Sequence, residues 1–303
     1  MNRRDFLQRS GAAALALGAV PFPLAWTARA DETKRRRILM FTRSVGFQHN
    51  SVKRFKPGEL SVAETVVTDL GKKYGFDVLC EKDGRVFLSK EFPKFDGFVF
   101  ETQGDLTSEK SQDGTPPMPP EGKKALLKAV ASGKGFAGCH CASDTFHSPG
   151  RADKNQPPDK IDPYIAMLGG EFIRHGQQQK AWMRVVDKRF PGAEALDDFQ
   201  LHEEWYSLKN FAPDLHVILV QDTKGMKNVD YDRPPYPATW ARKHHQGRVF
   251  FTSMGHRDDV WKNETFQKLL LGGLSWSLGL AKADLTPNLN DATPEAGELP
   301  GAK

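Results

Sequence analysis

The chain has 303 residues, of which 39% are hydrophobic, and a formal net charge of +5. Four arginines and one aspartate in residues 1–30 contribute +3 of this charge. The +2 that remains, with no basic run interleaved with aromatic residues, excludes nucleic acid as an expected partner. The length and composition suit one large domain with a hydrophobic core. The odd cysteine count (Cys80, Cys139 and Cys141) argues against a disulfide framework.

The first thirty residues have the pattern of an export signal. Arg3-Arg4 is a twin-arginine pair, residues 11–20 are small and mildly apolar, and Ala28-Arg29-Ala30 fits a cleavage site. A transmembrane anchor is the alternative, but the apolar run is too short and is followed by two prolines. We therefore expect residues 1–30 to engage the twin-arginine translocation machinery, and the mature protein to be periplasmic or otherwise exported.

Strand and helix patterns alternate through the first half of the mature chain. Short apolar runs predict strands at 37–42, 76–80, 95–101 and 135–139, and apolar residues at helical spacing predict helices at 62–74 and 121–132. This alternation is typical of a doubly wound, mostly parallel sheet with helices on both faces.

The second half of the chain is less regular. The patterns predict a short helix at 161–168, strands at 181–186 and 216–220, a β-hairpin formed by 236–242 and 247–253, and a last helix at 263–278. The polar segment 148–159 is either a lid or disordered. Residues 31–282 are expected to form the α/β domain, and the Pro- and Glu-rich residues 283–303 a disordered tail.

Histidines stand at several predicted strand ends. His49 and His140 follow the first and fourth strands, His256 follows the hairpin, His175 precedes a strand, and Glu204 lies in an acidic, aromatic patch. Parallel strands share one carboxyl edge, where ligands bind in open α/β sheets, so His49, His140 and His256 are expected to converge. Imidazoles with a carboxylate suit a divalent metal such as zinc, and equally suit metal-free acid–base catalysis by His140 and Glu204. No nucleotide cofactor is expected.

The segment around His140 has the shape of a nucleophile elbow. In Gly138-Cys139-His140-Cys141-Ala142 the central position is a histidine, and each cysteine is displaced by one residue. The cysteines are interpreted as small packing residues, with a redox or metal-handling role as the alternative. Asp144 either caps the following helix or orients His140 as part of the catalytic group.

Four further residues are expected to bind substrate. Gln48 and Gln103 lie in the loops after the first and third strands, and Trp205 and Tyr206 adjoin the acidic pair that contains Glu204.

Together these motifs resemble the ThuA-like (trehalose utilisation) domains. The matching segments, in the family's order over roughly residues 37–280, are Gly46–Ser51, Gly138–Asp144, Gly169–Phe172 with His175, Glu203–Tyr206 and Gly247–His256. The resemblance implies a class I glutamine amidotransferase-like, flavodoxin-like fold in which His140 replaces the amidotransferase cysteine. It also implies a role in the catabolism of oxidised (3-keto) disaccharides or glycosides. This chain departs from the family in Glu203-Glu204, where Asp-Glu is expected, and in the cysteine pair beside His140.

Two functions from different classes follow from this resemblance. The first is an exported hydrolase or lyase that cleaves 3-keto-glycosides with a His/Glu site, with or without metal assistance. The second is a non-catalytic carbohydrate-binding or accessory protein on a scaffold that has lost its nucleophile. The sequence leaves open whether the chain forms a homo-oligomer.

Overall fold

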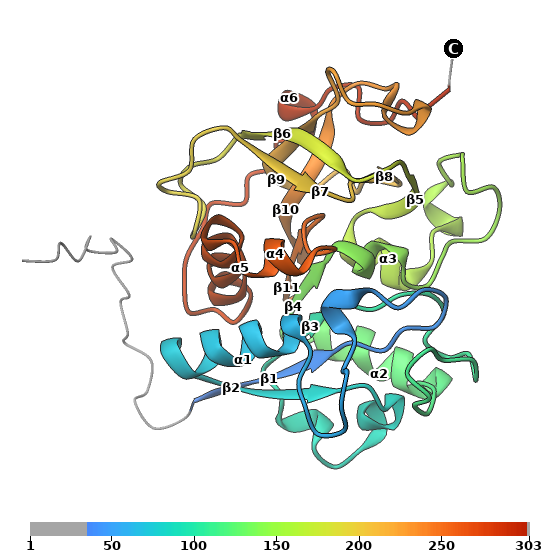
Figure 1. Ribbon diagram of the computed structural model, residues 1–303, viewed down its shortest axis with the longest axis vertical. Helices are drawn as coiled ribbons and strands as arrows, with labels where there is room; N and C mark the ends of the chain where they lie inside the picture. Colours follow the sequence, from blue (N-terminus) through green and yellow to red (C-terminus); the bar gives the residue numbers. More distant parts are fainter. Residues whose placement is uncertain (1–34, 302–303) are drawn as a thin grey trace, which may run out of the picture.

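A computed structural model describes residues 35–301, so the predicted export signal lies outside the described residues. The fold is built on a nine-stranded mixed sheet of order β2-β1-β3-β4-β11-β10-β9-β6-β7, with a separate two-stranded sheet, β5-β8 (Figure 1). The strands are β1 (Arg36–Phe41), β2 (Phe76–Glu81), β3 (Gly97–Phe100), β4 (Gly135–Cys139), β5 (Glu171–His175), β6 (Gln179–Val185), β7 (Phe199–Glu203), β8 (Tyr206–Lys209), β9 (His216–Asp222), β10 (Tyr236–His244) and β11 (Gly247–Thr252).

Helices cover both faces of the parallel half of the sheet. Alternate residues of each strand point to opposite faces, so Met40 and Val99 belong to one hydrophobic core, and Leu39 and Phe98 to the other. The helices are α1 (Val62–Tyr74), α2 (Pro120–Ala131), α3 (Pro163–Leu168), α4 (Asp258–Trp261), α5 (Glu264–Ser277) and α6 (Leu289–Ala292). Residues of α1 and α5 pack in the first core and residues of α2 and α3 in the second, which confirms the predicted α/β architecture.

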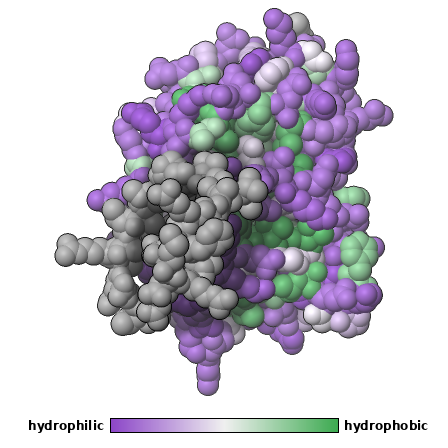
Figure 2. All heavy atoms as spheres, turned by 60° about the vertical axis from the view of Figure 1, so that its left-hand side comes forward, coloured by the Kyte–Doolittle hydropathy of each residue, from purple (hydrophilic) through white to green (hydrophobic). Residues whose placement is uncertain are grey.

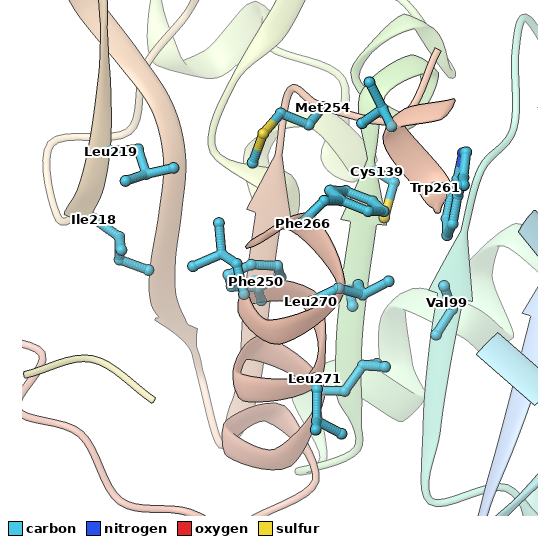
Figure 3. Packing of buried hydrophobic residues seen from close by; sticks show 14 of the residues in the cluster. Val99, Cys139, Ile218, Leu219, Phe250, Met254, Trp261, Phe266, Leu270 and Leu271 are labelled. Carbon is cyan, nitrogen blue, oxygen red and sulfur yellow. The ribbon is translucent and has the colours of Figure 1, made fainter. Parts of the chain in front are cut away.

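Helix α5 packs closely against β11 and against the loop at Pro191, because it has glycines where it meets them. A Cβ at Gly272 would lie 1.8 Å from the carbonyl oxygen of Pro191, and one at Gly273 would lie 2.5 Å from the Phe250 ring. Figure 3 shows Phe266, Leu270 and other apolar side chains of this region packed over β4 and β11. The helix therefore fixes the two strands whose carboxyl ends carry His140 and His256.

The antiparallel half extends further than the predicted hairpin. β10 and β11 pair antiparallel as expected, and β9, β6 and β7 continue the antiparallel pattern beyond β10. Segment 199–209, which the sequence showed only as a polar, aromatic patch, forms β7 and β8. These two strands carry Glu204 between them, so the antiparallel half contributes directly to the site described below.

Two segments expected to be irregular are held in place. Contrary to the predicted disorder of the tail, the Asn288 side chain accepts from Val217 N at 2.6 Å and donates to Val217 O at 3.0 Å, and Ala296 and Leu299 are buried. The composition predicted disorder because the tail has few apolar residues, whereas the tail is held by hydrogen bonds to backbone groups of β9. In the loop 148–159, the backbone N–H of Gln156 donates to Asn210 Oδ1 and its side-chain Oε1 accepts from Lys209 Nζ, so that loop is ordered. Its role as a lid remains a prediction.

One face of the molecule is mostly polar. On the face drawn in Figure 2 hydrophilic residues predominate, with smaller hydrophobic areas between them. Within residues 35–301 no helix has the length and apolar character needed to cross a bilayer.

Candidate functional site

Three histidines and one glutamate come together at the carboxyl edge of the parallel strands. His49, His140, His256 and Glu204 each offer one ligand atom, and these atoms all lie within 4.8 Å of one another. The imidazole rings stand nearly perpendicular to each other, with centroids 5.0–5.2 Å apart. We call these four residues the His/Glu cluster.

The parallel sheet explains why three of the four residues meet. His49 follows β1, His140 follows β4 and His256 follows β11, and all three strands run in the same direction. Their carboxyl ends therefore share one edge of the sheet, as the sequence predicted. Glu204 reaches this edge from the connection between β7 and β8, which leads from the nine-stranded sheet to the two-stranded one.

His140 occupies a strained turn. It follows β4 directly, begins a 3₁₀ helix (His140–Asp144) and has a φ of +37°, a left-handed conformation that costs roughly 1–3 kcal/mol for a non-glycine residue. Its Nδ1 lies 3.1 Å from the carbonyl oxygen of Ser253 and donates to it. The proton is therefore on Nδ1, and Nε2 presents a lone pair to the cluster.

The ring nitrogens that face the centre of the cluster have Glu204 as their neighbour and lack well-formed hydrogen bonds. His49 Nδ1, His140 Nε2 and His256 Nδ1 are all buried and make no well-formed hydrogen bond within the described residues, while His140 Nε2 and His256 Nδ1 lie 3.7 and 3.0 Å from Glu204 Oε2. Buried polar atoms are normally satisfied, so three such nitrogens grouped around one point require an explanation. Imidazole nitrogens beside a carboxylate are the ligands preferred by zinc and similar divalent ions, and the cluster fits such an ion.

The electrostatics of the cluster favour the neutral forms of His49 and His140 and the ionised form of Glu204. Burial, and then the neighbouring His140 and His256, hold the pKa of His49 well below its ordinary value, and burial likewise lowers the pKa of His140. For Glu204, burial alone would raise the pKa, but hydrogen bonding to His140 and His256 outweighs it, so the pKa lies below the ordinary value. Neutral imidazoles and an ionised carboxylate are the forms that bind a cation.

His175, predicted as a metal ligand, lies outside the cluster. Its Nδ1 is 3.5 Å from Glu204 Oε1 and 3.0 Å from the carbonyl oxygen of Gly176, and its side chain is 41% exposed. The ring stacks on Tyr206 at the outer side of Glu204. The geometry therefore places His175 next to the carboxylate, at a partly exposed position.

Asp144 does not contact His140, contrary to the predicted orienting role, and it lies inside the 3₁₀ helix instead of capping it. Its Oδ2 accepts from Gln103 Nε2 at 2.8 Å, and its Oδ1 lies 2.6 Å from His147 Nε2. His140 is oriented by a backbone carbonyl, which the sequence could not indicate.

The two predicted glutamines brace the loop that carries His49. Gln103 Oε1 accepts from the backbone N–H groups of Gly46 and Phe47 at 2.6 and 2.7 Å, while its Nε2 is bound to Asp144. Gln48 donates to Asp113. Both side chains are thus engaged in holding the loop, and a role in binding substrate remains a prediction.

The predicted aromatic pair divides between two environments. Tyr206 packs its ring 3.9 Å from that of His140, and its hydroxyl lies 3.4 Å from His49 Nε2. Trp205 is fully buried in the hydrophobic core that contains Met40 and Val99, and its indole N–H donates to the carbonyl oxygen of Gln179. Trp205 therefore cannot reach a substrate, which corrects its predicted binding role.

Two buried acids, Glu101 and Glu203, lie beneath the cluster, and neither was assigned a role from the sequence. Glu101 is fully buried directly after β3, and neither of its carboxyl oxygens makes a well-formed hydrogen bond within residues 35–301. Burial, with Glu203 nearby, raises its pKa well above the ordinary value. Burial also raises the pKa of Glu203 to about 8. The only sequence signal was the position of Glu101 at a strand end.

The two cysteines beside His140 are packing residues. Cys139 belongs to one hydrophobic core and Cys141 to the other, and both are buried and free. Burial raises the pKa of each thiol well above its ordinary value, so neither has thiolate character. This arrangement agrees with the packing interpretation and gives no support to a redox role.

These features define an α/β protein with a His/Glu cluster at the carboxyl edge of its parallel strands. Residues 37–277 match the ThuA family, described as "Trehalose utilisation", and the chain belongs to that family. The fold is similar to that of a ThuA-like protein from Bacteroides uniformis (16% identity, 83% of this chain and 95% of that one, TM-score 0.59). It is also similar to a ThuA-like protein from Parabacteroides merdae (17% identity, 83% and 93%, TM-score 0.56). A search among curated protein sequences gave no match.

Proposed function

We propose that this protein is an exported enzyme of sugar catabolism that cleaves 3-keto-glycosides or 3-keto-disaccharides at the His/Glu cluster. The observation that carries the proposal is the meeting of three buried imidazole nitrogens with one ionised carboxylate. Membership of a family described by trehalose utilisation supports a sugar substrate.

The chemistry of a 3-keto sugar matches what such a cluster can do. The ketone at C3 acidifies the proton on C2, so a base can remove it. The electron pair of the C2–H bond forms a C1=C2 double bond, the C1–O bond breaks, and the departing oxygen takes a proton. Addition of water across the double bond then yields the free 3-keto sugar. The reaction needs a base, an acid and a group that polarises the ketone.

The residues of this chain divide among those roles. His49, His140 and His256 would hold a divalent ion, which supplies polarisation of the ketone oxygen when bound. Glu204, ionised and partly exposed, takes the C2 proton. His175, 3.5 Å from Glu204, hands a proton to the leaving oxygen and exchanges with solvent. Without a metal, His140 Nε2 is the available base, because Ser253 holds the proton on Nδ1.

The direct test is turnover of 3-keto-trehalose by the purified mature protein, with its metal content measured by elemental analysis. We expect release of glucose and 3-keto-glucose, and a stoichiometric divalent metal. A second candidate, a sugar-binding accessory protein, is favoured by one observation: His140 stands at the elbow where a nucleophile would be. That candidate predicts saturable sugar binding with neither product nor bound metal.

The export part of the proposal rests on residues 1–30 and has its own test. N-terminal sequencing of protein recovered from the periplasm should show a chain that starts at Asp31. Replacing Arg3-Arg4 by a lysine pair should leave the uncleaved chain in the cytoplasm. Uncleaved wild-type chain in the periplasm would argue against the predicted cleavage site.

A further inference from the structure

A glutamine outside the cluster connects His256 to an arginine. Gln178 immediately precedes β6, and its Nε2 lies 2.9 Å from His256 Nε2. Its Oε1 accepts from Arg257 Nη1 at 2.6 Å. Gln178 therefore bridges two neighbouring residues that lie almost eighty positions away in the chain.

Arg257 determines which way the Gln178 amide points. Asp259 binds the other side of the guanidinium, with Nε–Oδ1 and Nη2–Oδ2 distances of 2.8 and 3.0 Å, and leaves Nη1 directed at Gln178. A guanidinium only donates hydrogen bonds, so the amide oxygen must face it. The NH₂ group of Gln178 consequently faces His256 and donates to its Nε2.

This donation fixes the tautomer of His256. A neutral imidazole whose Nε2 accepts a hydrogen bond has its proton on Nδ1. His256 Nδ1 is the atom within the cluster, 3.0 Å from Glu204 Oε2. His140 is set the opposite way, because its Nδ1 donates to Ser253 and its Nε2 faces the cluster as a lone pair. One histidine thus has the tautomer of a metal ligand, and the other has a proton where a ligand needs a lone pair.

We propose that Gln178 and Arg257 form a tautomer lock that opposes binding of a divalent cation by His256. A metal-bound imidazole normally donates its second N–H to an acceptor. Here that would require the Gln178 amide to turn over, so that its oxygen accepts from His256 Nε2–H and its NH₂ group faces Arg257. Two donors would then oppose each other, and Arg257 must move away before the cation is held by all three histidines.

The position of Arg257 allows such a movement. Gln178, His256 and Arg257 line an open depression with a volume of about 350 Å³, together with Asn50, Asp258 and Asp259. The Arg257 side chain is 33% exposed, and its other partner, Asp259, is 64% exposed. The lock therefore lies at the solvent-facing side of the cluster, where it can open without disturbing the core.

The inference rests on the proposed metal-binding use of the cluster and is tested by zinc affinity, independently of turnover. The dissociation constant for Zn²⁺ is measured by competition with a chromophoric chelator on the mature protein. Arg257→Ala, which frees the amide to turn over, should tighten binding by about 10- to 100-fold, the usual scale of effects from groups that orient a ligand. Gln178→Met, which removes the donor without a change of charge, should tighten it less.

Two controls separate the lock from other effects. Gln179→Met removes a neighbouring amide that bonds to Lys227 instead of His256, and should leave the affinity unchanged. Loss of the Arg257 charge also favours a cation, but that contribution is screened at 1 M salt, where the Debye length is about 3 Å. Unchanged Zn²⁺ affinity of both Arg257→Ala and Gln178→Met at high salt would overturn the proposal.

The ¹⁵N chemical shifts of the His256 ring test the lock in metal-free protein. They should show the proton on Nδ1 in the wild type, and on Nε2 or divided between the two nitrogens in Gln178→Met. A proton on Nε2 in the wild type would refute the lock even if the protein turned over 3-keto sugars. A proton that stays on Nδ1 in Gln178→Met would also refute it, because Glu204 Oε2, 3.0 Å from Nδ1, would then be what holds the proton there. A shift of the proton toward Nε2 in Gln178→Met would support the lock even if every 3-keto sugar failed as a substrate.

Discussion

Replacement of His140 by asparagine tests the centre of the site while sparing the backbone. His140 has a φ of +37°, and asparagine is among the few residues that tolerate this left-handed conformation. The substitution removes the hydrogen bond to the Ser253 carbonyl and the ring contact with Tyr206. Each is worth about 1 kcal/mol, so the free energy of unfolding should fall by about 1–2 kcal/mol and Tm by a few degrees.

The functional loss should be much larger than the loss of stability. Turnover of 3-keto-trehalose should fall by about 10²–10⁴-fold, the usual contribution of a positioned acid or base, and Zn²⁺ affinity should fall with it. The matched control is His245→Asn, because His245 also has a positive φ, of 53°, but lies exposed in the β10–β11 turn. Wild-type turnover and Zn²⁺ affinity in folded His140→Asn, checked by circular dichroism, would refute the assignment of His140.

Three further predictions concern the surroundings of the site and the C-terminal tail. Hydrogen bonding to Asp144, and then to Glu171, raises the pKa of His147 to about 9. The contribution of protonated His147 to the free energy of unfolding is therefore complete below pH 6.5 and is lost as pH rises through 9. Because the His147 side chain is 45% exposed, this contribution amounts to about 1 kcal/mol. Urea unfolding should accordingly show His147→Gln destabilised at pH 6 and equal to wild type at pH 10; an equal deficit at both would contradict this. Phe47, 59% exposed with its ring 5.0 Å from that of His49, should stack on a sugar, so Phe47→Ala should raise KM while Phe55→Ala, equally exposed, should not; equal KM values would contradict a stacking role. A chain that ends at residue 282 should unfold at a lower temperature than the full chain because it lacks the contacts of the tail with β9, and an unchanged Tm would show that those contacts contribute nothing.

The sequence was sufficient where one rule of sheet geometry decides the outcome. His49, His140 and His256 each follow a strand of the parallel sheet, and parallel strands end at one edge, so their convergence could be predicted without any knowledge of contacts. Glu204 was harder to place, because it reaches the same edge through β7 and β8. β7 has polar residues at its exposed positions, and the four-residue β8 buries a serine and a lysine, so both strands give a weak periodic signal.

The errors have equally local causes. Neighbouring residues of an extended chain point in opposite directions, so only one of Trp205 and Tyr206 could face the site, and the pattern does not say which. His140 was paired with Asp144 because the two are close in sequence, whereas its partner is a carbonyl at Ser253, more than a hundred residues away. Gln178 drew no notice, since its role depends on the direction of one amide group.

Deuterium exchange at C2 of a 3-keto-glucoside tests the central claim most directly. The mature protein, supplied with Zn²⁺, is incubated with the sugar in D₂O, and label at C2 and cleavage at C1 are followed by NMR against a protein-free sample. Removal of the C2 proton by Glu204 predicts protein-dependent label or cleavage, reduced by about 10²-fold or more in Glu204→Gln. Exchange and cleavage no faster than in the protein-free sample would contradict the assignment of the His/Glu cluster as the site of this reaction.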